Sequence, residues 1–81
     1  MIRVTIHMRD GRQFSVDDVQ KVTQLVLGFG KGDRATARGE EILNFQFIPW
    51  RTTIVEGKTK ICSVDSPKVE SIEAELMDKE G

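Results

Sequence analysis

The strict alternation of apolar and polar residues over residues 2–9 is the feature that most constrains the fold. The apolar set occupies every second position: Ile2, Val4, Ile6 and Met8. The polar set fills the positions between: Arg3, Thr5, His7 and Arg9. Because successive strand side chains point to opposite faces, this pattern predicts a strand with one face in the core and the other in solvent.

Asp10 and Gly11 follow this strand and indicate a tight turn into a second one. A two-residue loop would set Ile6 opposite Ser15 and would mix apolar and polar residues on one face. A three-residue loop over residues 9–11 sets Ile6 opposite Phe14. Directly opposed residues share a face, so the second register is predicted, with Gly11 in the left-handed conformation. The same register pairs Val4 with Val16, Arg3 with Asp17 and His7 with Gln13.

The aromatic stretch over residues 42–50 contains two of the four phenylalanines and the only tryptophan. Its apolar positions alternate with polar ones: Leu43, Phe45 and Phe47 against Asn44 and Gln46. This alternation predicts the central strand of a small sheet. Pro49 has no backbone donor, so we expect the strand to end there and Trp50 to swing across an edge of the core.

Residues 15–29 fit two structures. Ser15, with an acidic residue three positions on, resembles the N-cap of a helix. The β-prone run over residues 25–29 instead favours a bend at residues 17–18 followed by a strand over 23–29. We prefer the strand and keep the helix as the alternative.

Residues 28–41 form the longest polar stretch of the chain. Its glycines are interleaved with charged residues: Gly28, Gly30, Gly32 and Gly39 with Lys31, Asp33, Arg34 and Arg38. We expect a flexible loop over about 30–41, or the tip of a long hairpin if the flanking segments pair.

The last third of the chain predicts a β-hairpin and then a helix. Residues 52–56 and 60–64 are β-prone and flank a turn at residues 57–58. The pair Ser66-Pro67 has the signature of a helix start, and spacings of three and four place the remaining apolar residues on one helical face. These residues are Val69, Ile72 and Leu76. The tail over 78–81 is expected to fray.

Taken together, these segments predict one domain over residues 1–81 of the α+β class. We expect a small antiparallel β-sheet or partly open β-barrel of five to six strands with a C-terminal α-helix. The chain has only 81 residues, and a single core of this size seldom supplies more than ~3–5 kcal/mol. Association of copies is a common source of further stability, so we expect a homo-oligomer.

Cysteine and histidine are too scarce for disulfide or metal chemistry. Cys62 is the only cysteine and His7 the only histidine, so no intrachain disulfide can form and a zinc site would be incomplete. We expect no metal and no cofactor. The longest aliphatic run, residues 25–27, is far shorter than a signal-peptide core or a membrane span. The sequence therefore predicts a cytoplasmic protein without a membrane partner.

Charge is distributed unevenly along the chain. The net charge is −1, but residues 1–60 carry ten Lys and Arg against seven Asp and Glu, which gives +3. Residues 61–81 carry two against six, which gives −4. Neither value approaches that of a dedicated duplex-DNA binder.

The glycine-rich stretch is the first candidate binding site. Closely spaced glycines let backbone amides approach a phosphate, and Lys31, Arg34 and Arg38 would supply charge. The spacing matches neither the P-loop nor the dinucleotide fingerprint, so a solvated hairpin tip is the competing interpretation.

Aromatic and arginine side chains form the second candidate. Trp50 with Arg51, and Phe29 beside the glycines, are the residue types that stack on nucleobases or anchor a partner protein. Trp50 at a core edge or a self-association interface is the competing interpretation. His7 is expected to be a surface histidine opposite Gln13, and Cys62 a small buried apolar residue.

Two functions follow from these residues. One is a non-catalytic interaction protein, a homo-oligomer that binds another macromolecule through an exposed strand face or the Trp50 edge. The other is a binding module for single-stranded nucleic acid or a phosphorylated small molecule. Its charge would come from Lys31, Arg34, Arg38 and Arg51, and its stacking plane from Phe29 or Trp50. Catalysis is disfavoured because no triad, metal cluster or carboxylate pair can be assembled from the sequence.

The order of a short strand, an Asp-Gly turn, an aromatic run ending Phe47-Ile48-Pro49-Trp50 and a closing hairpin resembles that of many small proteins of bacteria and their phages. The resemblance carries no diagnostic motif, and no residue role can be transferred from it. It implies a regulator or inhibitor of a host protein, encoded by a phage or mobile element, as one form of interaction protein.

Overall fold

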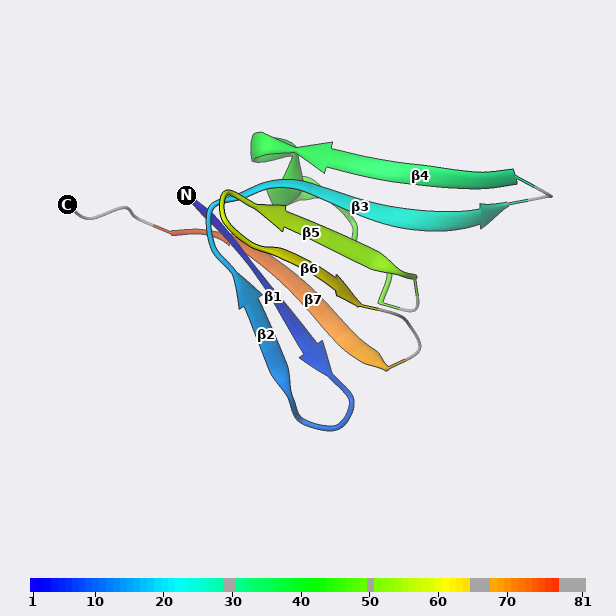
Figure 1. Ribbon diagram of the computed structural model, residues 1–81, viewed down its shortest axis with the longest axis horizontal. Helices are drawn as coiled ribbons and strands as arrows, with labels where there is room; N and C mark the ends of the chain where they lie inside the picture. The colour runs from blue at the N-terminus through cyan, green and yellow to red at the C-terminus, as the bar shows by residue number, and fades with distance from the viewer. Residues whose placement is uncertain (29–30, 50, 65–67, 78–81) are drawn as a thin grey trace.

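A computed structural model of the chain describes residues 1–28, 31–49, 51–64 and 68–77. Over these ranges the fold is almost entirely β, with one short 3-10 helix (Figure 1). The strands are β1 Ile2–Met8, β2 Gln13–Val16, β3 Val19–Gly28, β4 Lys31–Arg38, β5 Thr53–Gly57, β6 Ile61–Val64 and β7 Val69–Leu76. The 3-10 helix η1 spans Gly39–Asn44. The strands form a three-stranded sheet, β2-β1-β7, and a four-stranded sheet, β4-β3-β5-β6, with antiparallel pairing in both.

The β1–β2 hairpin confirms the predicted register. Ile6 lies opposite Phe14 and Val4 opposite Val16, as the alternation requires. Gly11 has a φ of 95°, the left-handed conformation predicted for the three-residue loop. The outer pairs also match the prediction: Arg3 with Asp17 at 2.6 Å, and His7 opposite Gln13.

Residues 17–18 carry the chain from one sheet to the other. Asp18 has a φ of 52°, a conformation that aspartate tolerates better than most residues. The segment that follows forms strand β3, so the strand preferred over a helix is confirmed. β3 begins at Val19, earlier than expected. Its early start matters because it adds Lys21 to the paired region.

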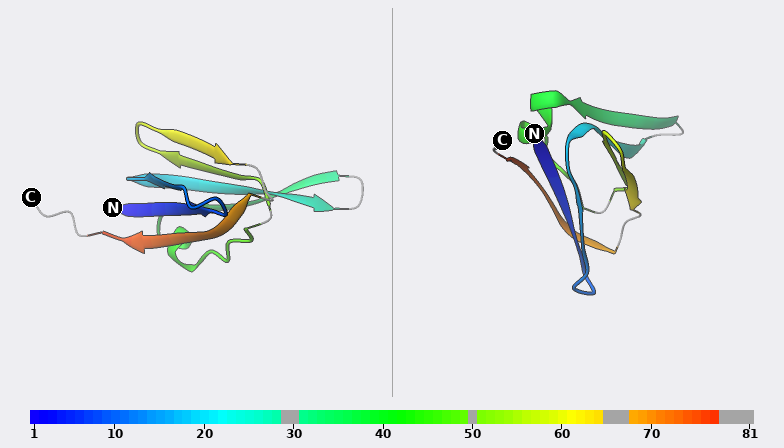
Figure 2. Two further views of the ribbon diagram at one scale, coloured as in Figure 1. Left: turned by 90° about the horizontal axis from the view of Figure 1, so that it is seen from below. Right: turned by 60° about the vertical axis from the view of Figure 1, so that its left-hand side comes forward.

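Residues 31–38, expected to be a loop, form strand β4. They pair with β3 from Lys21 opposite Arg38 to Gly28 opposite Lys31, and the hairpin projects beyond β5 (Figures 1 and 2). The polar residues misled the prediction because β4 is an edge strand, and charged side chains are common on edges.

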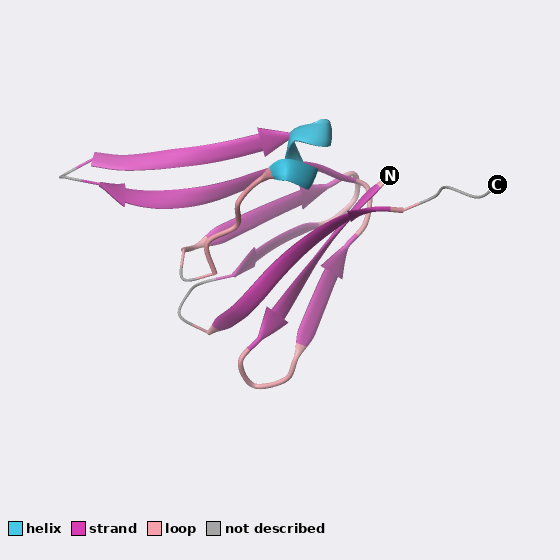
Figure 3. Ribbon diagram, turned by 180° about the vertical axis from the view of Figure 1, so that it is seen from behind, coloured by secondary structure: helices cyan, strands magenta, loops and turns pink. Residues whose placement is uncertain are grey.

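The predicted central strand over residues 42–50 is wrong. Residues up to Asn44 belong to η1, and no strand follows before Thr53 in the described part of the chain. Glu41 starts the helix by accepting a hydrogen bond from the backbone N–H of Arg38 at 3.1 Å. Phe45 and Phe47 still pack against the core, with their ring centroids 5.0 Å apart. Figure 3 shows η1 and the loop after it crossing one side of the two sheets.

The predicted C-terminal α-helix is also wrong, because residues 69–76 form strand β7 on the free side of β1. Alternate residues from 71 to 75 face the polar outer side of β1: Ser71, Glu73 and Glu75. Long-range pairing with β1 outweighs the local helix signal at Ser66-Pro67, which lies outside the described residues. The molecule is thus an all-β domain of two sheets, without a closed barrel, rather than an α+β domain.

The core lies between the inner faces of the two sheets. Its fully buried members come from both sheets and from η1: Val4, Ile6, Val22, Ile42 and Val55. At one end the β5–β6 turn meets β2, where a Cβ on Gly57 would lie 2.7 Å from Val16 Cγ1. The predicted β5–β6 hairpin is confirmed. No helix within the described residues is long and apolar enough to span a membrane.

Candidate interaction surface

The outer face of the four-stranded sheet brings together two of the predicted site residues. Because directly opposed residues share a face, the pairing places Lys21 beside both Arg38 and Glu56. It also places Arg34 beside Leu25 on the same face. We call this surface the basic face. It consists of Lys21, Leu25, Arg34, Thr36, Arg38, Ile54, Glu56, Ile61 and their neighbours Thr23 and Ser63.

The charges of the basic face are predominantly positive. Three cations stand against one carboxylate, Glu56, a net charge of +2. Lys21 Nζ lies 3.3 Å from Glu56 Oε2, so this carboxylate is already paired. Within the described residues Arg34 and Arg38 form no ion pair, and both are exposed. Two strand residues four positions apart are separated by about 13 Å, so these arginines can contact two points on a partner.

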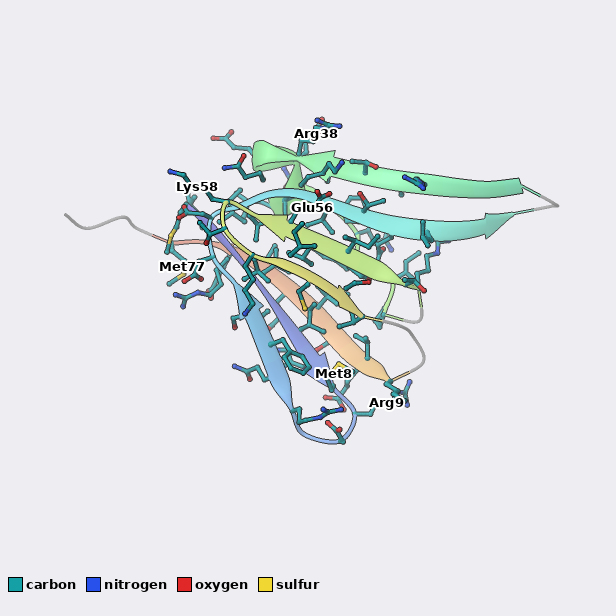
Figure 4. All side chains as sticks on the ribbon, viewed as in Figure 1. Met8, Arg9, Arg38, Glu56, Lys58 and Met77 are labelled. Carbon is teal, nitrogen blue, oxygen red and sulfur yellow. The ribbon has the colours of Figure 1, made fainter. Side chains whose placement is uncertain are left out.

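The basic face also has an aliphatic component. Ile61 on β6 is 68% exposed, the largest value among the large apolar side chains of the described residues. Leu25 and Ile54 are half-buried between the charged side chains. Glu56 stands on the viewer's side of β5 in Figure 4, and Arg38 lies at the end of β4. A surface of this composition suits a partner with both charge and apolar contacts.

The remaining predicted site residues are not on the basic face as the structure describes it. Lys31 belongs to β4 and pairs with Gly28. Arg51 is half-buried in the loop before β5, where its N–H donates to the Ile48 carbonyl at 3.1 Å. Phe29 and Trp50 lie outside the described residues.

A buried glutamine holds the loop that carries Arg51. The Gln24 side chain is fully buried; its Oε1 accepts from the Ile48 N–H at 3.0 Å, and its Nε2 donates to the Ile48 carbonyl at 3.0 Å. Nε2 also donates to Thr53 Oγ1 at 2.8 Å, and that hydroxyl donates to the Arg51 carbonyl. One side-chain amide therefore satisfies both backbone groups of Ile48, as a neighbouring strand would.

The outer face of the three-stranded sheet has the opposite charge. Its charged groups are Arg3 on β1, Asp17 next to β2, and Glu73 and Glu75 on β7. Three carboxylates stand against the Arg3 guanidinium, and Lys60 of the β5–β6 turn also approaches this face, where its Nζ donates to the Ser15 carbonyl at 3.2 Å. We call this surface the acidic face; its uncharged members are Thr5, His7, Gln13, Ser15 and Ser71.

Two side-chain pairs organise the acidic face. The Arg3 guanidinium donates to Asp17, which lowers the pKa of that carboxyl and raises the pKa of Arg3. His7 Nε2 lies 2.7 Å from Glu73 Oε2. The prediction that His7 is a surface residue is correct. Its contact with Glu73 is not predicted from the sequence, because a helix is expected where β7 lies.

Reactive groups do not gather at one place. His7 lies on the outer face of the three-stranded sheet, whereas Cys62 pairs with Val55 on the inner side of the four-stranded sheet. Among the described residues, no three side chains of the metal-binding types form a group that could hold an ion.

Comparisons with known protein families, curated proteins and solved structures found no match.

Sequence reasoning missed Lys21 and Glu56 as members of the site. Neither has a local signal, because each became part of the basic face only through pairing with another strand.

Proposed function

We propose that this chain is a non-catalytic interaction domain that binds an acidic macromolecular surface through its basic face. The observation that carries the proposal is the alignment of Lys21, Arg34 and Arg38 on one exposed sheet face whose only carboxylate is already paired. Such a face attracts negatively charged partners and accelerates their association.

The distribution of reactive groups supports a non-catalytic role. A general base acts within hydrogen-bond reach of the group that it deprotonates, usually inside a cavity that excludes water. The His7–Glu73 pair instead lies on an open sheet face, with Glu73 69% exposed. Cys62, the only thiol of the chain, belongs to the other sheet and to its inner side, away from His7.

The composition of the basic face favours a protein partner over a nucleic acid. Its apolar members are aliphatic: Leu25, Ile54 and Ile61. Proteins that bind single strands usually stack bases on aromatic side chains, and the described residues of this face include none. Arginine is enriched in protein interfaces, and the core of an interface is more apolar than the rest of a protein surface.

The proposal is tested with labelled poly-glutamate and a labelled single-stranded oligonucleotide, followed by fluorescence anisotropy. We expect the chain to bind the acidic peptide, and the double substitution Arg34→Ala and Arg38→Ala to weaken binding about tenfold, which corresponds to about 1.4 kcal/mol. The matched control is Lys58→Ala with Lys68→Ala, which removes the same charge at exposed positions outside the face.

Equal weakening by both double variants would mean that net charge alone acts, and would contradict a specific face. Binding of the oligonucleotide but not of the peptide would change the partner to a nucleic acid. If charge dominates, raising the salt concentration from about 50 mM to about 300 mM must also weaken binding, since the Debye length shortens over that range.

A further inference from the structure

We infer that a second copy of this chain is a partner of the basic face, and that it docks with its acidic face. This inference rests on the proposed function, because it names the acidic surface that the basic face binds. The two faces carry an excess of opposite charge: Lys21, Arg34 and Arg38 outnumber Glu56 on one, and Asp17, Glu73 and Glu75 outnumber Arg3 on the other.

The fold places the two faces on opposite sides of one copy. Each sheet turns its inner side to the shared core, so the two outer faces point away from each other (Figure 2). Arg34 and Arg38 therefore cannot reach Glu73 and Glu75 of the same molecule across the core. Both faces are built from paired strands rather than loops, and so present their charges at fixed spacings.

Charge also determines how two copies can meet. Contact between two basic faces would set cations against cations, and contact between two acidic faces would set carboxylates against carboxylates. Like charges across an interface are unfavourable, whereas the basic face of one copy against the acidic face of the next pairs opposite charges. The contact is then head to tail, and repeated contacts produce a ring or an open chain.

Specific groups remain available for this contact. Arg34 and Arg38 have no ion-pair partner among the described residues, and Glu73 is 69% exposed although it contacts His7. The exposed Ile61 lies next to Glu56 on the basic face and adds an apolar contact at its rim. We expect an interaction that is sensitive to salt and depends on both sets of charges.

The experiment uses two charge-reversed variants of the full 81-residue chain. The first variant, Arg34→Glu with Arg38→Glu, keeps the native acidic face and loses the basic one. The second, Glu73→Lys with Glu75→Lys, keeps the native basic face and loses the acidic one. Neither variant can associate with itself through the inferred contact. In a mixture, the native basic face of the second variant can still bind the native acidic face of the first.

Sedimentation velocity at about 25 mM and about 300 mM salt measures the result. We expect the average mass of the wild-type chain to rise with concentration at low salt and to fall at high salt. Each variant alone should remain monomeric, and the equimolar mixture should assemble, again only at low salt. Circular dichroism checks that both variants are folded; if one is not, Arg34→Gln with Arg38→Gln or Glu73→Gln with Glu75→Gln replaces it, and each should weaken wild-type association.

A wild-type chain that stays monomeric at low salt overturns the inference, as does a mixture that assembles no better than its components. Association that survives both reversals also overturns it, because another surface must then be responsible. If the chain still binds poly-glutamate through Arg34 and Arg38 while the mixture stays monomeric, only this inference fails. If the mixture stays monomeric and the chain also fails to bind poly-glutamate through Arg34 and Arg38, the proposed function is wrong as well.

Discussion

The two sheets have similar inner surfaces and opposite outer ones. On the inner side both contribute aliphatic residues that are fully buried, such as Ile6 in one and Val55 in the other. On the outer side one sheet carries mainly carboxylates and the other mainly cations. Alternation along a strand makes this separation easy, because the residues that form the core and those that meet a partner occupy different positions of the same strand. Stability and recognition should therefore respond to different substitutions.

The largest effect is expected when an inner aliphatic residue is compared with an outer one. Ile6→Ala removes a fully buried side chain and should lower the free energy of unfolding by about 3–4 kcal/mol. Ile61→Ala, at a position 68% exposed, should change it by less than about 0.5 kcal/mol. Urea denaturation measures both. Similar losses in the two variants would show that Ile61 is buried, and would break the distinction between inner and outer surfaces.

Two glutamines, one buried and one exposed, test the same difference between the inner and outer surfaces. Gln24→Ala removes the acceptor of the Ile48 N–H, while the Ile48 carbonyl and the Thr53 hydroxyl each lose one partner and keep the one that Arg51 provides; the change should cost about 2–3 kcal/mol. Gln13→Ala, at an exposed outer position, should be nearly neutral. Hydrogen exchange of the Ile48 amide gives a local readout, and its protection should fall only in the Gln24 variant. Unchanged protection would contradict the role of Gln24 as a substitute strand.

The place where the sheets meet is predicted to tolerate little added volume. Gly57→Ala would put a Cβ 2.7 Å from Val16 Cγ1 and 2.8 Å from the Asp17 carbonyl oxygen. The backbone atom cannot move aside easily, so we expect a loss of about 1–2 kcal/mol of stability. Gly39→Ala serves as a contrast, because no atom lies within 4 Å of its Cβ position and only its positive φ of 56° resists the change. If Gly57→Ala left the free energy of unfolding unchanged, Gly57 would not be in close contact with Val16 and Asp17.

The smallest effect concerns pH and belongs to the three-stranded sheet. Hydrogen bonds from Arg12 and Arg3 lower the pKa of Asp10 and Asp17 respectively below the ordinary value of 3.8. A carboxyl with a lowered folded-state pKa contributes stability above its unfolded pKa, and that contribution is lost as the pH falls through the folded value. We therefore expect stability to decline slightly below about pH 4. In Asp17→Asn the decline should be shallower, as thermal unfolding across pH 2–6 would show; an identical pH profile would exclude Asp17 as a contributor.

Local sequence pattern was sufficient for the two short hairpins. In the β1–β2 hairpin the alternation from Ile2 to Met8 and the need for φ > 0 at Gly11 selected one register, and the structure has it. The same reasoning failed over residues 42–50, where an equally clear alternation occurs in a helix and a loop. There the backbone of Ile48 is satisfied by Gln24, a residue far away in sequence.

The candidate site was predictable only in part. Arg34 and Arg38 were named because they lie near glycines, but their common face with Lys21 and Glu56 depends on the pairing of β3 with β4 and β5. The acidic face was not predicted as a surface, because β7 carried the local signals of a helix. A free edge on β1 gave residues 69–76 a partner that the local signals do not reveal.

From the sequence alone came the alternation and register of β1 and β2, the tight turns of the two short hairpins and the existence of β3, β5 and β6, since these depend on neighbours within a few residues. The tertiary structure determined which strands lie side by side, the conformation of residues 39–49 and the opposite charges of the two outer faces. Preferences of a single residue for helix or strand differ by only about 1 kcal/mol. Burial of a side chain and pairing with a distant strand contribute more than that, so the final arrangement follows from contacts between segments far apart in the chain.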